Sequence, residues 1–186
     1  DMAVMVSANE RVPIEVIQDF VKSKASWIIK NAGYFDNAQP EAKAEREYVS
    51  GESFKYLGRQ IRLKVVEGAS EDIRYSRGYI QLTVKEKATV MRKEVLVQKW
   101  FRQRAQKVFC DVLDKMFLIV EKHGVKKPVV KIRGMKARWG SCLKDKSTVI
   151  LNSELIKAPK YCIEYVVLHE LVHFIYSNHN ADFFGI

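Results

Sequence analysis

The chain has 186 residues, of which 47% are hydrophobic and 29% charged, a composition typical of a soluble globular protein with one domain, or a domain and a small companion. No apolar run is long enough to span a membrane and no secretory signal is visible, so the sequence does not predict a membrane protein. The net charge of +10 is densest over residues 85–107 and 122–146. A basic surface attracts nucleic acid, anionic membranes or acidic substrates, but the favoured interpretation of these charges is solvated helix faces and loops.

The cysteines are odd in number and form no CxxC pair; they are Cys110, Cys142 and Cys162. This pattern favours reduced thiols and a cytoplasmic location over a disulfide scaffold. Because residue 1 is an aspartate and not a start methionine, we expect the beginning of the natural chain to be missing.

The first part of the chain, residues 1–86, is interpreted as an N-terminal region of helix and β-hairpins. A short strand is predicted at Met2–Val6, a helix from Pro13 to Ala32, and a polar connector over residues 34–47. Short alternating runs separated by glycines then predict scaffold strands. These strands are residues 48–49, 53–57, 61–66, 73–75 and 79–84.

Residues 87–186 are interpreted as a second region that begins with a long helix. A wide apolar stripe with basic residues on the opposite side predicts this helix over Thr89–Lys122. The elements expected after it are a strand at 129–132, a loop at 133–142, a strand at 148–152 and a helical turn at 153–156. A last main helix is predicted to begin near Lys160, after Pro159.

This last helix contains the sequence His169-Glu170-Leu171-Val172-His173, which is a His-Glu-x-x-His motif. Residues four apart lie on one face of a helix, so His169 and His173 present two imidazoles to one point, as a tetrahedral zinc site requires. Glu170 lies about 100° around the helix, where its carboxylate can act as a general base for a water that the metal acidifies. The motif therefore predicts a zinc hydrolase.

The surroundings of the motif strengthen this prediction. The flanking residues are apolar on nearly every side, which indicates a buried helix in which two histidines and a glutamate are costly unless they are paired or bind a metal. His179 is the best candidate for a third ligand, because a helix end at Ser177-Asn178 could return it to the metal. Asp182, Glu164 and Glu154 remain rival ligands. Asn180 is expected to cap a short helix after it.

Substrate-binding residues are predicted on the loop and strand before this helix. Arg138 can bind an anion or a carbonyl, or stabilise an oxyanion. Together with Trp139 and Ser141, it is expected to form one wall of a cleft. Thr148–Leu151 would border the cleft as a sheet edge that pairs with an extended peptide, with Ile150 facing the substrate; the alternative is an interior strand that is unavailable.

Several segments together resemble a known family. They are Arg138–Cys142, Leu151-Asn152, Leu155-Ile156, Pro159, Tyr165–His173, Asn178-His179 with Phe183, and upstream Ala25–Ile29, Gly51-Glu52 and Tyr56–Gly58. The chain is similar to the YgjP-like predicted metal-dependent hydrolases, which are related to WLM and SprT-like zincin metallopeptidases. Two departures are Phe184, where a tryptophan is common, and the end at Ile186, where family members continue with a further helix.

The resemblance implies an α+β fold. It would consist of a minimal zincin-like metallopeptidase core with a long helix, a small sheet and the HExxH helix, plus a β-rich N-terminal part. It also implies one Zn²⁺ held by His169, His173 and His179, with Glu170 as general base, and peptidase activity as an expectation. Pairing of the substrate with a strand by its backbone would favour an unstructured peptide or protein as substrate. The closing C-terminal helix is expected to be truncated.

Two other functions stay open at this point. One is a metal-dependent nucleotide phosphohydrolase, which the arginines suit although no carboxylate cluster for magnesium stands out. The other is a nucleic-acid-associated protein with a structural zinc, which predicts a closed site with four ligands instead of an open one. The leading interpretation is a zinc-dependent metallopeptidase.

Overall fold

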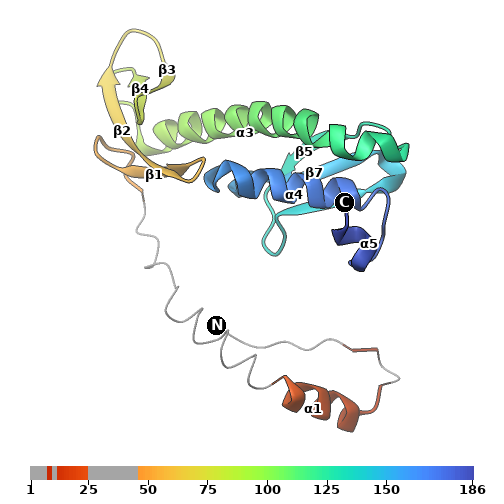
Figure 1. Ribbon diagram of the computed structural model, residues 1–186. Helices are drawn as coiled ribbons and strands as arrows, with labels where there is room; N and C mark the ends of the chain where they lie inside the picture. Colours follow the sequence, from red (N-terminus) through yellow and green to blue (C-terminus); the bar gives the residue numbers. More distant parts are fainter. Residues whose placement is uncertain (1–7, 10–11, 25–45) are drawn as a thin grey trace. The chain divides into compact units, whose positions relative to one another are not determined.

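The computed structural model describes residues 8–9, 12–24 and 46–186 (Figure 1). Contacts divide the chain into two compact units, Asp1–Arg46 and Glu47–Ile186. The predicted division between residues 86 and 87 stays a prediction. The predicted strand at Met2–Val6 and the expected continuation of the first helix to Ala32 lie outside the described residues.

The described part of the first unit contains one helix, α1 (Ile14–Ser23). Pro13 precedes it with extended backbone, as expected for a residue whose ring fixes φ at a helix start. None of its residues is buried among the described residues.

The second unit begins with a four-stranded sheet made of β1 (Ser53–Tyr56), β2 (Arg59–Glu67), β3 (Asp72–Ser76) and β4 (Tyr79–Val84). The strand order is β1-β2-β4-β3, with β2 and β4 parallel and the other pairs antiparallel. Alternation puts Ile61, Leu63, Ile80 and Leu82 on the buried face. The predicted strands are confirmed with small shifts in their ends, except residues 48–49, which form no strand.

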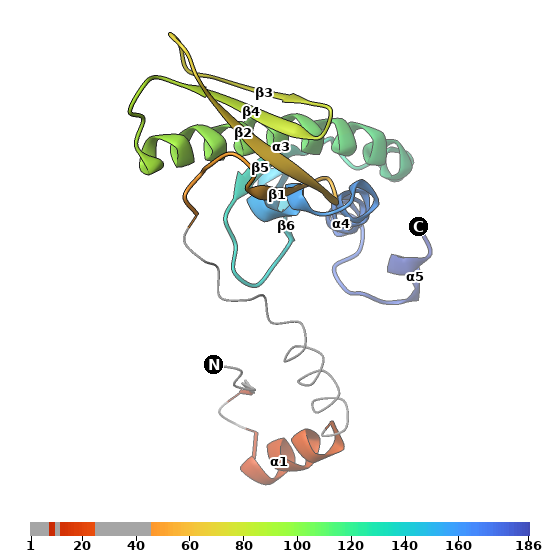
Figure 2. The same cartoon turned by 90° about the vertical axis from the view of Figure 1, so that its left-hand side faces the viewer.

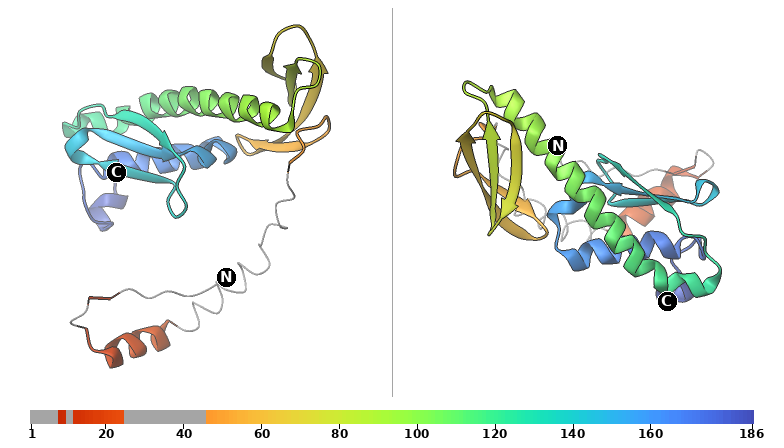
Figure 3. Two further views of the ribbon diagram at one scale, coloured as in Figure 1. Left: turned by 180° about the vertical axis from the view of Figure 1, so that it is seen from behind. Right: turned by 90° about the horizontal axis from the view of Figure 1, so that it is seen from above.

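The long helix α3 (Val90–Val120) is confirmed and joins the two parts of the second unit. The side chain of Thr89 accepts a hydrogen bond from the Arg92 N–H and caps its first turn, which suits the preference of threonine for this position. A 3-10 turn, η1 (Glu121–His123), follows, and Gly124 ends it with φ +76°. Within the second unit, the four-stranded sheet lies at the first half of α3 and the other elements of this unit lie farther along it (Figures 2 and 3).

A second sheet has three strands, β5 (Val129–Arg133), β6 (Gly140–Leu143) and β7 (Thr148–Asn152), in the order β5-β7-β6. The 3-10 turn η2 (Lys144–Lys146) connects β6 to β7. The prediction that Thr148–Leu151 forms a sheet edge is wrong. β7 pairs with β5 on one side and β6 on the other, so its amides are used on both sides. The edge strands are β5 and β6, and β6 begins inside the segment predicted to be a loop.

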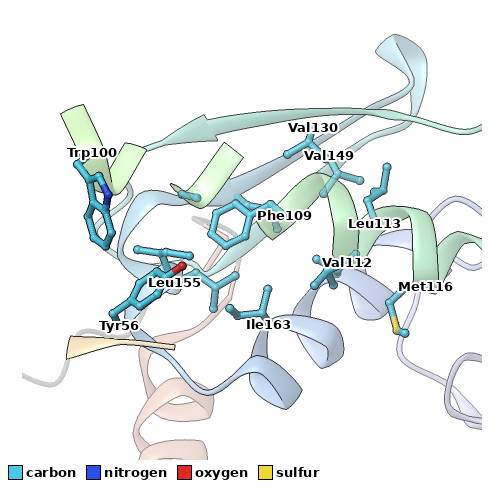
Figure 4. Packing of buried hydrophobic residues seen from close by; sticks show 14 of the residues in the cluster. Tyr56, Trp100, Phe109, Val112, Leu113, Met116, Val130, Val149, Leu155 and Ile163 are labelled. Carbon is cyan, nitrogen blue, oxygen red and sulfur yellow. The ribbon is translucent and has the colours of Figure 1, made fainter. Parts of the chain in front are cut away.

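The chain then forms the 3-10 segment η3 (Ser153–Lys157), the helix α4 (Lys160–Val172) and the short helix α5 (Ala181–Phe184). α4 begins at the predicted residue. Buried side chains of α3, α4 and the three-stranded sheet meet in one core (Figure 4). Phe109, Val112, Val149, Leu151 and Ile163 are among its fully buried members.

The turn between β1 and β2 contacts the start of α4. The backbone N–H groups of Leu57 and Gly58 donate to the carbonyls of Ile156 and Lys157, at 2.9 and 3.1 Å. Gly58 has φ +77°, and a Cβ at this position would lie 2.8 Å from Cγ of Pro159. The first sheet therefore braces the residues from which α4 begins.

The fold is α+β, with a long helix, two small sheets and shorter helices, as predicted. Within the described residues, no helix has both the length and the apolar character needed to cross a membrane. The three cysteines form no disulfide.

Candidate metal centre

Two histidine side chains project from the end of α4. His169 lies in its last turn, and His173 is the residue that ends the helix, still with helical backbone angles of φ −60° and ψ −22°. The N–H of His173 donates to the carbonyl of His169 at 3.3 Å, so the spacing of four residues keeps both rings on one face. Their ring centroids lie 4.9 Å apart.

A third histidine joins them from the segment between α4 and α5. The helix ends at Val172 instead of the predicted Ser177-Asn178, and a tight turn follows in which the Tyr176 N–H donates to the Val172 carbonyl at 2.9 Å. This earlier end lets the chain return, and Nε2 of His179 lies 3.0 Å from Nε2 of His169. The candidate ligand nitrogens of all three histidines lie within 4.8 Å of one another.

The rival ligands lie outside this cluster. Glu164 pairs with Lys115 at 2.9 Å, Glu154 pairs with Lys157, and Asp182 accepts a hydrogen bond from Asn180 at 3.4 Å. In the part of the chain that the structure describes, the only group of three or more potential metal ligands is the histidine trio.

Phe183 supports the trio from one side, a role that the sequence did not indicate. Its ring centroid lies 5.0, 4.9 and 4.7 Å from those of His169, His173 and His179. Asn180 caps α5 as predicted, because its Oδ1 accepts the Phe183 N–H at 3.0 Å. The cap and the buried Phe183 ring together hold α5 against the histidines.

The protonation of the histidines suits metal binding. Burial lowers the pKa of His169 and of His173, and nearby positive charges lower it further, although the hydrogen bond to Tyr176 raises that of His173. The lowered pKa values favour the neutral form of both rings. Nδ1 of His173 lies 3.3 Å from the carbonyl oxygen of Tyr176. Since a carbonyl only accepts, Nδ1 carries the proton and Nε2 keeps its lone pair. The trio therefore fits a divalent cation that prefers nitrogen ligands.

Glu170 lies beside the trio and is 7% exposed. Burial raises the pKa of its carboxyl group to about 7, although a hydrogen bond from the backbone N–H of Cys142 and the charge of Arg138 act in the opposite direction. Gly140 leaves the space for this side chain, since a Cβ there would lie 2.6 Å from both Cγ and Oε1 of Glu170. The sequence analysis placed Gly140 in a predicted loop and did not indicate this contact.

An open pocket of about 640 Å³ surrounds the three histidines and Glu170. The predicted residues Arg138, Trp139 and Ser141 line it. Ile150 does not line it, because β6 lies between β7 and the pocket. Other lining residues that sequence reasoning missed are Cys142, Lys144, Tyr165, Val166 and Ser177.

Two exposed aromatic side chains belong to this lining. Trp139 is 55% exposed and Tyr165 is 64% exposed. The sequence signal for Tyr165 was its place four residues before His169, on the same face of α4, and the two rings have centroids 6.0 Å apart. Lys144 donates to the Ser177 hydroxyl at 2.9 Å and so links η2 to the segment that carries His179.

Asn152 holds the pocket wall in place. Its side-chain amide donates to the carbonyls of Met135 and Arg138 at 2.8 and 2.9 Å, and its Oδ1 accepts the Glu154 N–H at 3.1 Å. Its own backbone N–H donates to the carbonyl of Trp139 at 2.9 Å. The residue is buried with all these groups satisfied, so the segment before β6 has one defined course.

A buried carboxyl group, three imidazoles that converge on one point and an open pocket define the class of metal-dependent hydrolases. The chain belongs to the YgjP-like family of metallopeptidase domains, whose model matches residues 1–186. This membership supports a metal-dependent peptidase that acts on peptides or proteins and holds a divalent metal.

A solved structure is also similar to part of the chain. It is the metallopeptidase zymogen jannalysin of Methanocaldococcus jannaschii, with 22% sequence identity and a TM-score of 0.36, covering 41% of this chain and 69% of that one. No curated protein matches the chain.

Proposed function

We propose that this domain is a zinc peptidase in which His169, His173 and His179 hold one Zn²⁺ and Glu170 is the general base. The observation that carries the proposal is the convergence of the three ring nitrogens within 4.8 Å, next to a buried carboxyl group and an open pocket. Three protein ligands leave one position of a tetrahedral zinc for water or substrate, which is typical of catalytic sites.

The metal, when bound, supplies Lewis-acid chemistry that polarises a carbonyl and lowers the pKa of water. Glu170 takes a proton from the attacking water and returns it to the leaving amine. Its pKa of about 7 suits both transfers near neutral pH. The Cys142 N–H orients the carboxylate by its hydrogen bond.

The substrate is proposed to lie along β6. The Asn152 N–H donates to the Trp139 carbonyl, so this carbonyl faces β7. In an antiparallel pair the direction of the backbone groups alternates along the strand, so those of Gly140 and Cys142 face away from β7. Cys142 uses its N–H for Glu170, so Gly140 offers the free edge groups nearest the site. An extended peptide can add to this edge by backbone pairing.

Side chains of the pocket then supply further contacts with this peptide. Trp139 and Tyr165 present apolar ring faces on the pocket lining, which suit a large apolar side chain of the substrate. Arg138 can donate to a substrate carbonyl or to the charge that develops on it. Ile150, on the interior strand, has no part in this arrangement.

The test is Glu170→Gln, which keeps the shape of the side chain and removes the base. We expect zinc content to be unchanged and turnover of a fluorescently labelled casein to fall by a factor of about 10² to 10⁴. The matched control is Glu164→Gln on the same helix, whose carboxylate pairs with Lys115 outside the metal cluster. Equal turnover by Glu170→Gln and the unsubstituted chain would remove Glu170 from the mechanism.

A further inference from the structure

The four-stranded sheet has a solvent-facing side that is separate from the metal centre. Strand register puts Arg62 of β2, Tyr79 of β4 and Ser76 of β3 in one row across this side. The next row contains Lys64, Gln81 and Arg74. On β1, Ser53 is the partner of Arg62, and Lys55, two residues further along the strand, therefore lies on the same side. We call this side the outer face of the four-stranded sheet.

The charges of the outer face have one dominant sign. Four exposed basic residues lie on this face, and they are Lys55, Arg62, Lys64 and Arg74. One acidic residue of these strands, Asp72, lies on the same side. Asp72 is already paired, because its carboxylate accepts from the Arg74 guanidinium and from the Ile73 N–H, and both bonds lower its pKa. A surface on which one sign of charge dominates attracts a partner of the opposite charge, so this bias indicates an anionic partner.

An aromatic ring lies in the middle of these cations. Tyr79 is 48% exposed, and its strand, β4, lies between β2, which carries Arg62 and Lys64, and β3, which carries Arg74. Neighbouring strands are about 4.8 Å apart, so the backbone of Tyr79 lies about one strand spacing from that of its register partner Arg62. Gln81, two residues along β4, adds an exposed amide that can donate and accept.

We propose that the outer face of the four-stranded sheet binds single-stranded nucleic acid. The cations on β1 and β2 follow the phosphates, and Tyr79 stacks on a base. A cationic surface combined with an exposed aromatic ring is the arrangement by which proteins bind single strands without a fixed sequence. An acidic polypeptide would match the charges but offers no flat ring for Tyr79, so the observations favour nucleic acid.

The experiment measures the fluorescence anisotropy of an end-labelled oligothymidylate of about 20 nucleotides, long enough to cover the face. The full chain is titrated between about 50 and 200 mM salt. We expect the affinity to fall steeply with salt. The double variant Arg62→Gln/Lys64→Gln should bind at least about tenfold more weakly at low salt, and its log–log salt slope should be smaller by about 1.4, from two lost single-strand phosphate contacts.

The matched control is Lys131→Gln/Arg133→Gln, which removes the same charge from exposed positions of β5 in the other sheet. We expect it to bind like the unsubstituted chain. Tyr79→Leu should weaken binding about tenfold without changing the salt slope, because it removes stacking and leaves the charges. If the first double variant unfolds, Lys55→Gln/Lys64→Gln removes two charges from the same face and should weaken binding in the same way.

Three outcomes would overturn the proposal. The first is no binding at about 50 mM salt. The second is an equal loss of affinity in the β5 control, which would assign binding to net charge. The third is displacement of the oligonucleotide by polyglutamate of equal charge as readily as by unlabelled oligothymidylate, which would indicate an acidic protein partner. None of these outcomes bears on the zinc peptidase, which Glu170→Gln tests.

Discussion

At the scale of single residues, Gly140 and Glu170 illustrate how closely the metal centre depends on one missing side chain. Glu170 is buried against the α-carbon of Gly140 in β6, and the same strand supplies the Cys142 N–H that binds its carboxylate. A base in a general acid–base mechanism must be held within hydrogen-bond reach of its proton. β6 provides this position by a steric contact and a hydrogen bond.

We therefore expect Gly140→Ala to displace Glu170 while leaving the histidines in place. Its Cβ would meet Cγ and Oε1 of Glu170 at 2.6 Å. Peptide turnover should fall by a factor of about 10², the lower end of general-base effects, with zinc content unchanged by elemental analysis. The control is Gly134→Ala in the preceding segment, where the nearest atom to a Cβ is the Ser153 hydroxyl at 4.0 Å. Full activity of Gly140→Ala would contradict the placement of Glu170.

At the scale of elements, the β1–β2 turn and the start of α4 form one unit. Leu57 and Gly58 donate to the carbonyls of the residues that precede Pro159, and Gly58 packs directly on Pro159. The helix that carries His169 is thus positioned from its beginning by the β1–β2 turn, which is distant in sequence. The four-stranded sheet therefore helps to position the helix that carries two of the histidines.

A comparison of two turn glycines tests this contact. Gly58 and Gly78 both have positive φ, +77° and +82°, but only Gly58 faces another segment, whereas a Cβ at Gly78 meets nothing within 4 Å. Gly78→Ala should cost about 1 kcal/mol of unfolding free energy from backbone strain alone. Gly58→Ala should cost about 1–3 kcal/mol more, from the collision with Pro159. Urea unfolding measures the loss of unfolding free energy in both variants. Equal losses would show that the β1–β2 turn moves away from Pro159 without a free-energy cost.

At the scale of the whole molecule, the two ends of the second unit have different chemistry. The metal centre forms where α4, α5 and β6 meet, and the outer face of the four-stranded sheet carries basic residues at the other half of α3 (Figure 1). The positive charge seen in the composition is therefore gathered in part on a defined surface. A single long helix joins both regions in one packed unit.

Metal binding should stabilise this unit as a whole. The purified chain is expected to hold about one zinc ion, and His169→Ala or His173→Ala should abolish this binding. The metal binds the folded state, so a zinc concentration about 100 times Kd should add about 2.7 kcal/mol to the unfolding free energy. Chelation should lower Tm accordingly. The control is His123→Ala at the end of η1, outside the histidine cluster, and retention of full zinc content by the other two variants would contradict the proposed site.

The sequence by itself determined the local elements and the core of the motif. The length of α3, the start of α4 and the shared face of His169 and His173 follow from apolar periodicity and a spacing of four residues, which depend only on neighbours along the chain. The alternation of apolar and polar residues predicted strands β2 and β4 of the first sheet for the same reason.

Only the tertiary structure decided which strand forms the edge beside the metal centre. Thr148–Asn152 has the stronger β pattern, but it lies between β5 and β6, and the weaker segment Gly140–Leu143 takes the edge. The positions of Gly140 against Glu170 and of Phe183 beneath the histidines were equally hidden. Strand order and such contacts join residues that are distant in sequence. They are selected by the free energy of packing, which produces no periodic pattern along the chain.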